Sequence, residues 1–445
     1  MREGSLDAPI RHPIPWKDAD FWDEAKLDEE LRRVFDICHG CRRCFNLCDS
    51  FPKLFDLIDE SKTEELDSVE SKDFKPVIDA CTLCDMCFLT KCPYVPPHEY
   101  NLDFPHLIVR ARAQAFKKGK VSTVEKQLVK TDRNGKMGCS THGLSNWATK
   151  RGNALTRPLM EATLGIHRDA ALPKFNDKPL TEITAPAINQ AAPASGRKAV
   201  IYATCFSNYN NAAIGEAARK VLAKNGVETE LVHPRCCGMP QLEHGDIEAV
   251  ATSAEETAAD LMPWIEKGYD VIAVVSSCAL MLKFEWPLIV PENEAVKKLS
   301  SATFDVSEYI MDIAKKEGMA EGMKPLDGGV TAHIACHARA QNMGQKATET
   351  LRLIPDTPVA VIERCSGHGG SWGVMKEFFE VGIKVGKPVF RTAAKAANSH
   401  VVSECPLARD HIVQGMEGAE GGNEAIKKTS SVTHPVELIA KSYGL

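Results

Sequence analysis

Two groups of four cysteines in the first hundred positions are the residues best suited to chemistry in this 445-residue chain. The first group has the spacing C-x2-C-x2-C-x3-C and comprises Cys38, Cys41, Cys44 and Cys48. The second has the spacing C-x2-C-x2-C-x4-C-P and comprises Cys81, Cys84, Cys87 and Cys92. Three thiolates spaced by three residues can bind three irons of a [4Fe–4S] cluster from one loop. The spacing therefore predicts two such clusters.

The fourth ligand of each predicted cluster comes from the other group, as in paired motifs of this kind. We expect one cluster on Cys38, Cys41, Cys44 and Cys92, and a second on Cys81, Cys84, Cys87 and Cys48. Asp49 follows the first group where proline is usual, and the second group has one extra residue before its last cysteine; neither change removes a ligand. Two zinc sites are the alternative, but zinc normally uses two separated cysteine pairs, so one cysteine per group would be surplus.

Seven further cysteines occur in the C-terminal half, each just after a short apolar run that predicts a strand. In a first unit, runs 199–203, 227–232 and 271–275 precede Cys205, the doublet Cys236–Cys237, and Cys278. In a second unit, runs 330–334, 359–362 and 401–402 precede Cys336, Cys365 and Cys405. Corresponding cysteines are offset by 131, 129 and 127 residues. This regularity predicts an internal duplication.

The strands of both units alternate with helical segments such as 212–222 and 246–267, which favours a parallel sheet covered by helices in each unit. Ligands of open α/β sheets bind beyond the carboxyl ends of the strands. We therefore expect the cysteines of each unit to meet at one sheet edge. The doublet is followed by Gly238 in the first unit, and the run Gly367–Gly370 follows Cys365 in the second. Glycine there would let backbone amides approach a ligand closely, although a tight turn explains it equally well.

The chain before these units is helix-biased, and residues 168–197 are irregular and end in an Ala/Pro-rich segment that is typical of a linker. We predict four parts: residues 1–137 with both [4Fe–4S] motifs, a connecting segment at 138–197, and two cysteine-rich units at 198–325 and 326–445. Residues Arg110–Lys136 carry nine Lys and Arg. That run is either a solvated helix face or a docking surface for an acidic partner or an anionic membrane.

The eight N-terminal cysteines, with a strand-poor spacer between the groups, resemble the α-helical ferredoxin module. The sequence HPRCCGMP, with Cys205 before it and Cys278 after it, resembles the duplicated cysteine-rich "CCG" domain of iron–sulfur subunits of oxidoreductases. Those subunits belong to the group that contains the iron–sulfur subunit of anaerobic glycerol-3-phosphate dehydrogenase and the heterodisulfide reductases. The resemblance implies a multidomain fold: an α-helical ferredoxin domain followed by two tandem α/β cysteine-rich domains.

The full CCG motif of this family has five cysteines per domain, which bind a cluster at which a disulfide is reduced. The first unit has only Cys205, Cys236, Cys237 and Cys278. The second has only Cys336, Cys365 and Cys405, with Ser366 in the doublet position. These sets are therefore candidates for a further cluster, the second less so, with His337 or His368 as an additional ligand there. The alternative is that they are reduced thiols in buried loops.

The remaining sequence signals limit the function. A net charge of −6 argues against a nucleic-acid binder. No Gly-rich nucleotide motif follows a strand, so hydride chemistry must be supplied by a partner. No secretory signal and no long apolar stretch are visible, and we expect a cytoplasmic protein or one peripheral to the inner face of the membrane.

These signals favour an electron-transfer subunit between a flavin dehydrogenase and a quinone or redox protein. The alternatives are a thiol/disulfide reductase centred on Cys236 and Cys237, and a non-catalytic iron–sulfur redox sensor.

Overall fold

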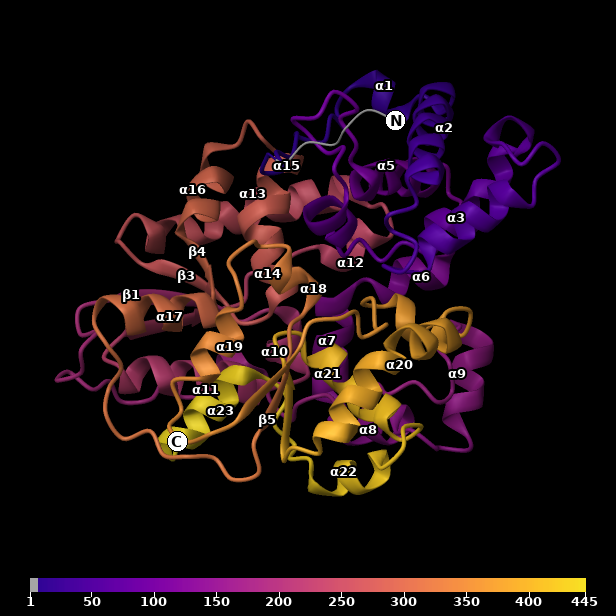
Figure 1. Ribbon diagram of the computed structural model, residues 1–445. Coiled ribbons are helices and arrows are strands. Elements are labelled where there is room, and N and C mark those ends of the chain that lie inside the picture. Colours follow the sequence, from indigo (N-terminus) through magenta and orange to yellow (C-terminus); the bar gives the residue numbers. More distant parts are fainter. Residues whose placement is uncertain (1–6) are drawn as a thin grey trace.

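Two small parallel sheets organise the C-terminal half of the protein in the computed structural model, which describes residues 7–445 (Figure 1). The first sheet has the order β2-β1-β3-β4, and its strands are β1 (Lys198–Tyr202), β2 (Glu228–Val232), β3 (Asp270–Ala273) and β4 (Thr303–Asp305). The second has the order β6-β5-β7, with β5 (Val330–His333), β6 (Val359–Ile362) and β7 (His400–Ser403). The predicted parallel sheets are confirmed.

The order β2-β1-β3 in the first repeat (residues 198–325) equals β6-β5-β7 in the second repeat (residues 326–445). Strand β4 has no counterpart among the named strands of the second repeat, and it was not expected from the sequence. Its three residues are too short to produce a recognisable apolar run. The long helices of the first repeat are α11 (Ala212–Lys224), α13 (Ile247–Ile265), α16 (Glu294–Ala302) and α17 (Val306–Lys316). The shorter ones are α10 (Cys205–Tyr209), α12 (Met239–Glu243), α14 (Ser276–Leu280), η5 (Met281–Glu285) and α15 (Trp286–Ile289).

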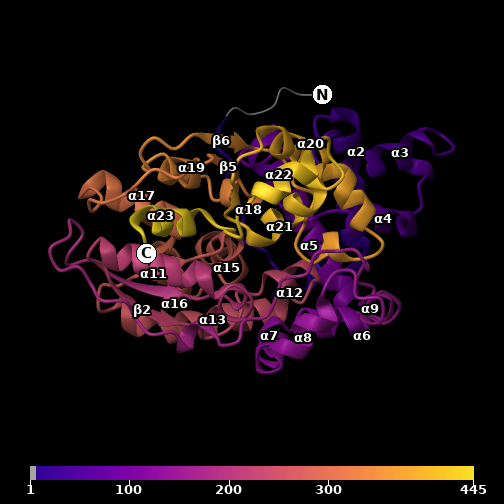
Figure 2. The same ribbon diagram turned by 90° about the horizontal axis from the view of Figure 1, so that it is seen from below.

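The helices of the second repeat complete the duplication. They are α18 (Cys336–Arg339), α19 (Lys346–Leu351), η6 (Trp372–Val374), α20 (Phe379–Ala396), α21 (Pro406–Met416), α22 (Gly422–Lys428) and α23 (Pro435–Tyr443). The last helix of each repeat packs on the other repeat: α23 contacts α11, and α17 contacts α19 (Figure 2). The side chain of Tyr443 in α23 donates to the carbonyl oxygen of Ala320 at 2.7 Å. The two repeats therefore share one interface built from both C-terminal helices.

Helices without strands form the N-terminal module (residues 7–117), as the composition predicts. They are α1 (Ala19–Trp22), α2 (Glu24–Cys41), α3 (Ser50–Asp59), η1 (Leu66–Ser68), η2 (Ser71–Phe74), α4 (Lys75–Asp79), η3 (Cys87–Lys91) and α5 (Phe104–Lys117). Aromatic contacts fill its interior: the ring of Phe104 lies 4.8 Å from that of Phe51 and 6.0 Å from that of Phe35. This core holds the two cysteine segments against each other.

The connection between the module and the first repeat is more ordered than the sequence indicates. It contains α6 (Thr123–Leu128), α7 (Thr131–Ser140), α8 (His142–Thr149), α9 (Thr156–Leu164) and η4 (Leu180–Glu182). Helix α7 runs across the predicted boundary at residue 137. Residues 168–197 are largely irregular, as expected, but they are not a free linker, because Leu180 is fully buried. An added Cβ at Gly215 would lie 2.1 Å from Leu180 Cδ2, so glycine allows this segment to pack on α11.

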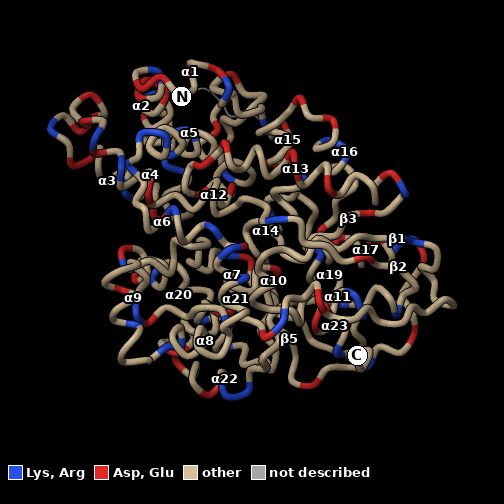
Figure 3. The backbone as a smooth tube through the Cα atoms, turned by 180° about the vertical axis from the view of Figure 1, so that it is seen from behind, with Lys and Arg blue, Asp and Glu red and all other residues tan. Residues whose placement is uncertain are grey.

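Charged residues of both signs are distributed over all parts of the molecule (Figure 3). The basic run Arg110–Lys136 is partly occupied by internal contacts. Arg110 donates to the carbonyl oxygen of Phe21 at 3.0 Å, Arg112 to that of Glu243 at 2.9 Å, and Lys118 pairs with Glu24 at 2.5 Å. In the part of the chain that the structure describes, no helix is both long and apolar enough to cross a bilayer.

Candidate functional site

The first group of thiols lies at the C-terminal end of α2. Cys38 and Cys41 belong to its last turns, Cys44 lies in the turn that follows, and Cys92 enters from the second cysteine segment. Burial raises the pKa of the Cys38 thiol, and the thiols of Cys92, Cys44 and Cys41 raise it further. Burial and the same neighbours, Cys92 and Cys41, raise the pKa of Cys44 to about 12. The structure thus brings together the four cysteines predicted for one cluster.

The second group of thiols consists of Cys48, just before α3, and three cysteines after α4: Cys81, Cys84 and Cys87. Burial raises the pKa of Cys48, and the thiols of Cys84 and Cys81 add to this effect. Burial raises the pKa of Cys87 as well, and Cys84, Cys81, Cys48 and Cys44 all contribute. These four cysteines are also the ones predicted to share a cluster, and the effect of Cys44 on Cys87 shows that the two groups are neighbours.

The extra residue before the last cysteine of the second group is accommodated by a π-helical turn. Residues Cys87–Lys91 form this turn, and the N–H of Cys92 donates to the carbonyl oxygen of Cys87 at 2.8 Å. A hydrogen bond to the fifth residue back encloses one residue more than an α-helical turn does. The C-x4-C spacing therefore still delivers Cys92 to the first group.

Both thiol groups fit [4Fe–4S] clusters, which require four thiolates and tolerate N–H donors to sulfur. Burial raises the pKa of Cys48, but backbone N–H groups of Ser50 and Phe51 lower it. Burial also raises the pKa of Cys84 to about 12, against the effect of the Met86 N–H. Such donors stabilise the thiolate that a cluster needs. Within residues 7–445, no group of three or more His, Cys, Asp or Glu side chains is arranged to hold a single metal ion.

Four thiols of the first repeat meet beyond the carboxyl ends of β1, β2 and β3: Cys205, Cys236, Cys237 and Cys278. All are buried except Cys205, which is half-buried. Hydrogen bonds from the thiols of Cys205 and Cys237 lower the pKa of Cys236 well below its usual value. The same contacts raise the pKa values of Cys205 and Cys237. The arrangement therefore favours one thiolate, on Cys236, with two neighbouring thiols as donors.

The N-terminal end of α7 closes this thiol group, which was not expected from the sequence. One carboxylate oxygen of Asp132 accepts the N–H of Cys236 at 2.6 Å, and the other lies 2.7 Å from Nε2 of His233. The side chain of Thr131 also helps to lower the pKa of Cys236. Thr131 and Asp132 lie about a hundred residues upstream of the doublet, so no local spacing could identify them.

The three thiols of the second repeat, Cys336, Cys365 and Cys405, also meet at the carboxyl edge of their sheet, but in a more open site. Cys365 is exposed, and the other two are half-buried. Burial raises the pKa of Cys336, and the thiol of Cys84 is the first of the neighbours that raise it further, together with Cys365 and Cys405. The second repeat thus faces a cysteine of the N-terminal module, a contact that was not predicted from the sequence.

Glycine after each doublet position brings a backbone amide to sulfur, as expected from the sequence. The N–H of Gly238 lies 3.5 Å from the sulfur of Cys236, and that of Gly367 lies 3.4 Å from the sulfur of Cys365. Both glycines have positive φ, at 85° and 77°, which side chains rarely allow. In the same run, an added Cβ at Gly369 would lie 2.6 Å from the side chain of Thr82. These glycines therefore allow the backbone to turn and also allow neighbouring atoms to come close to it.

The cysteine loop of residues 79–87 is held by both repeats. From the second repeat, Nε1–H of Trp372 donates to the carbonyl oxygen of Asp79 at 3.1 Å. From α5, the Arg112 guanidinium donates to the carbonyl oxygens of Ile78 and Cys81 and also to that of Glu243 in the first repeat. The loop that carries three of the predicted cluster ligands is thus a junction of all three parts.

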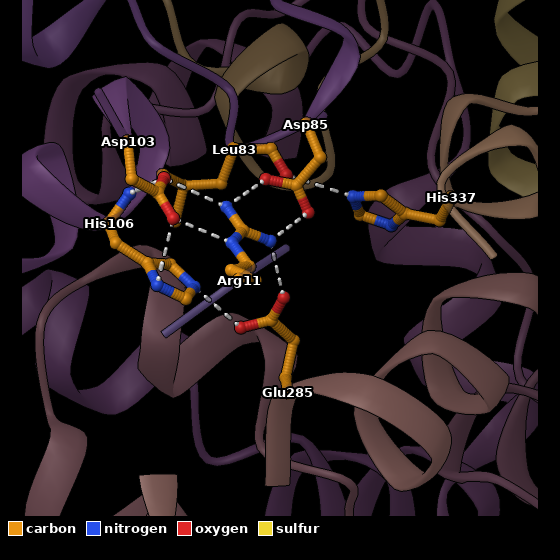
Figure 4. Close-up of polar contacts among 7 residues, drawn as sticks. All are labelled: Arg11, Leu83, Asp85, Asp103, His106, Glu285 and His337. Carbon is orange, nitrogen blue, oxygen red and sulfur yellow. Dashed lines mark hydrogen bonds and ion pairs between the residues drawn. The ribbon is translucent and has the colours of Figure 1, made fainter. Parts of the chain in front are cut away.

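A buried ion cluster around Arg11 fixes the N-terminal segment at the same junction (Figure 4). The guanidinium lies 2.8 Å from Asp85, 2.8 Å from Asp103 and 2.9 Å from Glu285 of the first repeat. His106 lies between two of these carboxylates, 3.1 Å from Glu285. Burial opposes ionisation, but His106 and Arg11 lower the pKa of Asp103 to about 2. No sequence pattern indicates this cluster, because its members come from four separate segments.

Cys139, which had no predicted role, is buried away from these thiol groups. Its S–H donates to the carbonyl oxygen of Tyr209 at 3.1 Å. It behaves as a small core residue.

The strand-end thiols agree with a known domain: residues 199–283 and 330–407 match the family described as "Cysteine-rich domain", CCG. The chain is 25% identical over 290 residues to one subunit of the anaerobic glycerol-3-phosphate dehydrogenase of Escherichia coli, covering 64% of this chain and 69% of that protein. It is 22% identical to one subunit of the dihydromethanophenazine:CoB–CoM heterodisulfide reductase of Methanosarcina barkeri, covering 55% of this chain and 59% of that protein. It is 25% identical to lactate utilization protein A of Bacillus cytotoxicus, covering 40% of this chain and 74% of that protein.

The protein is therefore one with two CCG cysteine-rich domains, which coincide with the two repeats. The chain is similar to these subunits of anaerobic glycerol-3-phosphate dehydrogenase and heterodisulfide reductase, and the resemblance inferred from the cysteine pattern is confirmed.

Proposed function

We propose that this protein is the iron–sulfur electron-transfer subunit of an oxidoreductase, which carries electrons from a flavin-dependent dehydrogenase subunit to a quinone or a redox protein. The observation that carries the proposal is the exchange of cysteines between segments: Cys92 lies with the first thiol group and Cys48 with the second. A [4Fe–4S] cluster on such a group accepts and donates one electron at a time. Two of the similar proteins are subunits of a dehydrogenase and of a reductase, which supports a role beside a partner.

The donor would dock near the first thiol group, because that group is closer to the surface. Its four cysteines are all half-buried, whereas Cys81 and Cys87 of the second group are buried. Around Cys44, the side chains of Arg42 and Arg43 are exposed, and that of Phe45 is 58% exposed. Arginine and aromatic side chains are enriched in protein interfaces. This face suits a partner surface with acidic and apolar groups.

Metal content of protein purified without oxygen tests the proposal. We expect about eight irons per chain and an EPR signal on reduction. Cys38→Ser and Cys84→Ser should each lower the iron content and remove a different component of the signal. Cys139→Ser is the matched control, because that buried thiol lies outside both groups, and it should retain both components. Four or fewer irons with bound zinc would contradict the proposal.

A second candidate function is thiol/disulfide reduction in the first repeat, favoured by the lowered pKa of Cys236. Because Cys236 is buried, the site would first open locally, and the Cys236 thiolate would then attack a substrate disulfide and release one substrate thiolate. A neighbouring thiol, Cys205 or Cys237, would then displace the second one. The protein would be left with a disulfide that needs two electrons for reduction. The same four thiols could instead hold a further cluster, in which case the iron content would rise to about twelve.

Substitution of the doublet separates these functions. If the first repeat is a reductase, Cys236→Ser abolishes turnover of disulfide substrates but leaves the iron content near eight. If the first repeat holds a further cluster, the unsubstituted protein contains about twelve irons, and the Cys236→Ser variant contains fewer. A Cys236→Ser, Cys237→Ser protein that keeps full disulfide turnover would exclude the reductase function.

For the basic run Arg110–Lys136 the sequence left open a solvated face, an acidic partner and an anionic membrane; we propose a membrane-attachment surface on the neighbouring helices α7, α8 and α9. Exposed apolar side chains are concentrated there: Met137 (62%), Leu144 (66%), Trp147 (50%), Leu155 (76%) and Leu159 (62%). Residues 133–160 contain no Asp or Glu, although the whole chain has a net charge of −6. The Lys and Arg side chains exposed in this segment are Arg133, Lys136, Lys150 and Arg151, of which Arg151 is paired with Glu417 of the second repeat. Apolar and aromatic side chains with a basic surround favour an anionic bilayer surface.

Vesicle co-sedimentation tests this attachment. The protein should bind phosphatidylglycerol-containing vesicles at least about tenfold more tightly than phosphatidylcholine vesicles. Leu144→Ser with Trp147→Ser should abolish binding, and Lys136→Glu with Lys150→Glu should remove the preference for anionic lipid. Phe284→Ser is the control, because Phe284 is also exposed, at 40%, but lies on the first repeat. Equal binding by all variants would refute the assignment.

A further inference from the structure

Figure 4 shows the side chain of His337 next to Leu83 and beside the ion cluster around Arg11. His337 follows Cys336 of the second repeat, and its side chain is only 7% exposed. Its Nε2 lies 3.1 Å from the carbonyl oxygen of Leu83, the residue before Cys84. Its Nδ1 lies 2.9 Å from Oγ of Ser277, the residue before Cys278. One imidazole therefore connects the neighbours of three cysteines that are far apart in the sequence.

The two contacts fix the protonation state of the ring. A carbonyl oxygen can only accept, so Nε2 carries the proton and donates it to Leu83. Nδ1 then accepts the hydroxyl proton of Ser277. With Nε2 bound to the carbonyl oxygen of Leu83 and Nδ1 to the hydroxyl of Ser277, both nitrogens have a partner and the ring is held in one orientation.

The turn that His337 holds is conformationally costly. Leu83 and Asp85, on either side of Cys84, both have positive φ, at 47° and 61°. Non-glycine residues adopt this region rarely and need support from surrounding contacts. The support comes from two sides: His337 binds the carbonyl oxygen of Leu83, and Arg11 binds the carboxylate of Asp85. Cys84 is thus held between a contact from the second repeat and one from the N-terminal segment.

We propose that His337 is a positioning residue that fixes the Cys84 turn relative to the cysteine loops of both CCG repeats. In this role it keeps the second thiol group of the N-terminal module, the thiols of the first repeat and those of the second repeat in a constant spatial relation. Gln341 reinforces the arrangement, since its Nε2 donates to the carbonyl oxygens of His337 and Ser276 at 3.2 and 3.3 Å. The EPR test of this inference rests on the proposed function, because it needs bound iron. The hydrogen–deuterium exchange test does not.

Three substitutions of His337 separate its two contacts. Gln places an N–H donor near the position of Nε2, whereas Asn places one near Nδ1, and Ala removes both. Hydrogen–deuterium exchange of the peptide 79–89 reports the Cys84 turn. Loss of one buried hydrogen bond should increase exchange there about tenfold in the Ala and Asn variants. The Gln variant should stay within about threefold of the unsubstituted protein, and this rescue would not occur if only ring packing mattered.

EPR of the reduced, iron-loaded protein provides the second readout. The Ala and Asn variants should retain their iron but show a changed signal and a shifted midpoint potential for the cluster that includes Cys84. The signal that depends on Cys38 should be unchanged. His400→Gln is the matched control: His400 is 3% exposed and contacts Ser430 at 2.8 Å, but it lies at the opposite, amino end of its strand.

The outcomes distinguish this inference from the proposed function. Unchanged exchange at 79–89 and an unchanged signal in the Ala variant would overturn the positioning role. Absence of iron from every variant would refute the proposed function, while the exchange experiment would still decide the role of His337. If the Ala variant does not fold, the comparison of the Gln and Asn variants gives the same decision.

Discussion

The two CCG repeats share a scaffold but differ in their thiol sites. At the end of the first strand, the hydroxyl of Tyr202 donates to the carbonyl oxygen of Arg235 in the first repeat. The equivalent His333 uses Nε2 to donate to the carbonyl oxygen of Arg364 in the second. Different side chains thus make the same link between the first strand and the doublet loop. Duplication has preserved the contact while changing its chemistry.

The thiol sites of the two repeats also differ in how far their cysteines are exposed to solvent. In the first repeat, Cys236 and Cys237 are buried, and Nε1–H of Trp286, which is fully buried, donates to the carbonyl oxygen of Cys237 at 3.0 Å. In the second repeat, Cys365 is exposed, and Ser366 replaces the other thiol of the doublet. The comparison indicates a closed site with its own thiolate and an open site that faces Cys84. One repeat supplies an enclosed chemical environment, and the other an opening to solvent beside the N-terminal module.

Lowering the pH should destabilise the second repeat more than the first, and this is the largest difference between the repeats that we expect. Burial lowers the pKa of His333 to about 4, that of His368 to about 3 and that of His411 to about 4. The unfolded chain binds these protons below a pH of about 6.5, so stability is lost as the pH falls from about 6.5 to about 4. His333 alone accounts for about 2 kcal/mol at pH 5. Hydrogen exchange at pH 7 and pH 5, corrected for intrinsic rates, should show selective loosening of β5–β7.

His333→Tyr provides the control for the acid effect, because it introduces the residue of the first repeat at the equivalent position. This variant should lose part of the acid sensitivity. If β1–β3 and β5–β7 loosen equally between pH 7 and pH 5, buried histidine is not what distinguishes the repeats.

Truncation of the two tryptophans should have unequal effects on stability. Trp286→Ala removes a fully buried side chain from the first repeat and should cost about 3–5 kcal/mol of unfolding free energy. Trp372→Ala removes a half-buried side chain from the second repeat and should cost about 1–2 kcal/mol. Denaturant unfolding measures both values. Equal costs would contradict the description of the first repeat as the closed one.

Alkylation should distinguish the thiols of the two repeats. Under native conditions, iodoacetamide should modify Cys365 about tenfold faster than Cys237, because a buried thiol reacts only after local opening, while the raised pKa of Cys365 limits its own rate. Mass spectrometry of peptides after timed quenching measures both rates. In denaturant the two rates should converge, and a difference that persists there would arise from local sequence rather than from burial.

Surface ion pairs should show the smallest difference. Arg197 of the first repeat pairs with Asp312 and Glu317, and its side chain is 17% exposed; Arg197→Ala should cost about 1 kcal/mol. Arg151 pairs with Glu417 of the second repeat, with side chains 41% and 44% exposed, and Arg151→Ala should cost less than about 0.5 kcal/mol. Thermal unfolding at low and high salt checks both, since added salt should remove the smaller effect first.

The strands and the duplication were predictable from sequence because apolar runs and offset cysteines are local signals. Run 359–362 coincides with β6, and run 330–334 differs from β5 by one residue. The grouping of thiols in the N-terminal module was predicted from the spacing together with the exchange of the fourth ligand that is usual in paired motifs, while the clusters that those thiols would hold stay a prediction.

Contacts between segments that are remote in sequence could not be predicted. Asp132 accepts the N–H of Cys236, but in the sequence its helix is only part of a basic run. Arg11 pairs with three carboxylates although it lies in an irregular segment. The approach of Cys84 to Cys336 depends on how the N-terminal module is placed on the repeats. Such placement results from surface complementarity, which no spacing rule encodes.

The packing of α23 on α11 has a consequence for biosynthesis. Residues Pro435–Tyr443 are the last helix of the chain, yet they cover a helix that begins more than two hundred residues earlier. During translation the first repeat therefore exposes the apolar face of α11 until α23 has left the ribosome. Domains that fold as independent units during synthesis bury such faces earlier. Here the first repeat completes its packing only when α23 of the second repeat arrives, so the two repeats mature together.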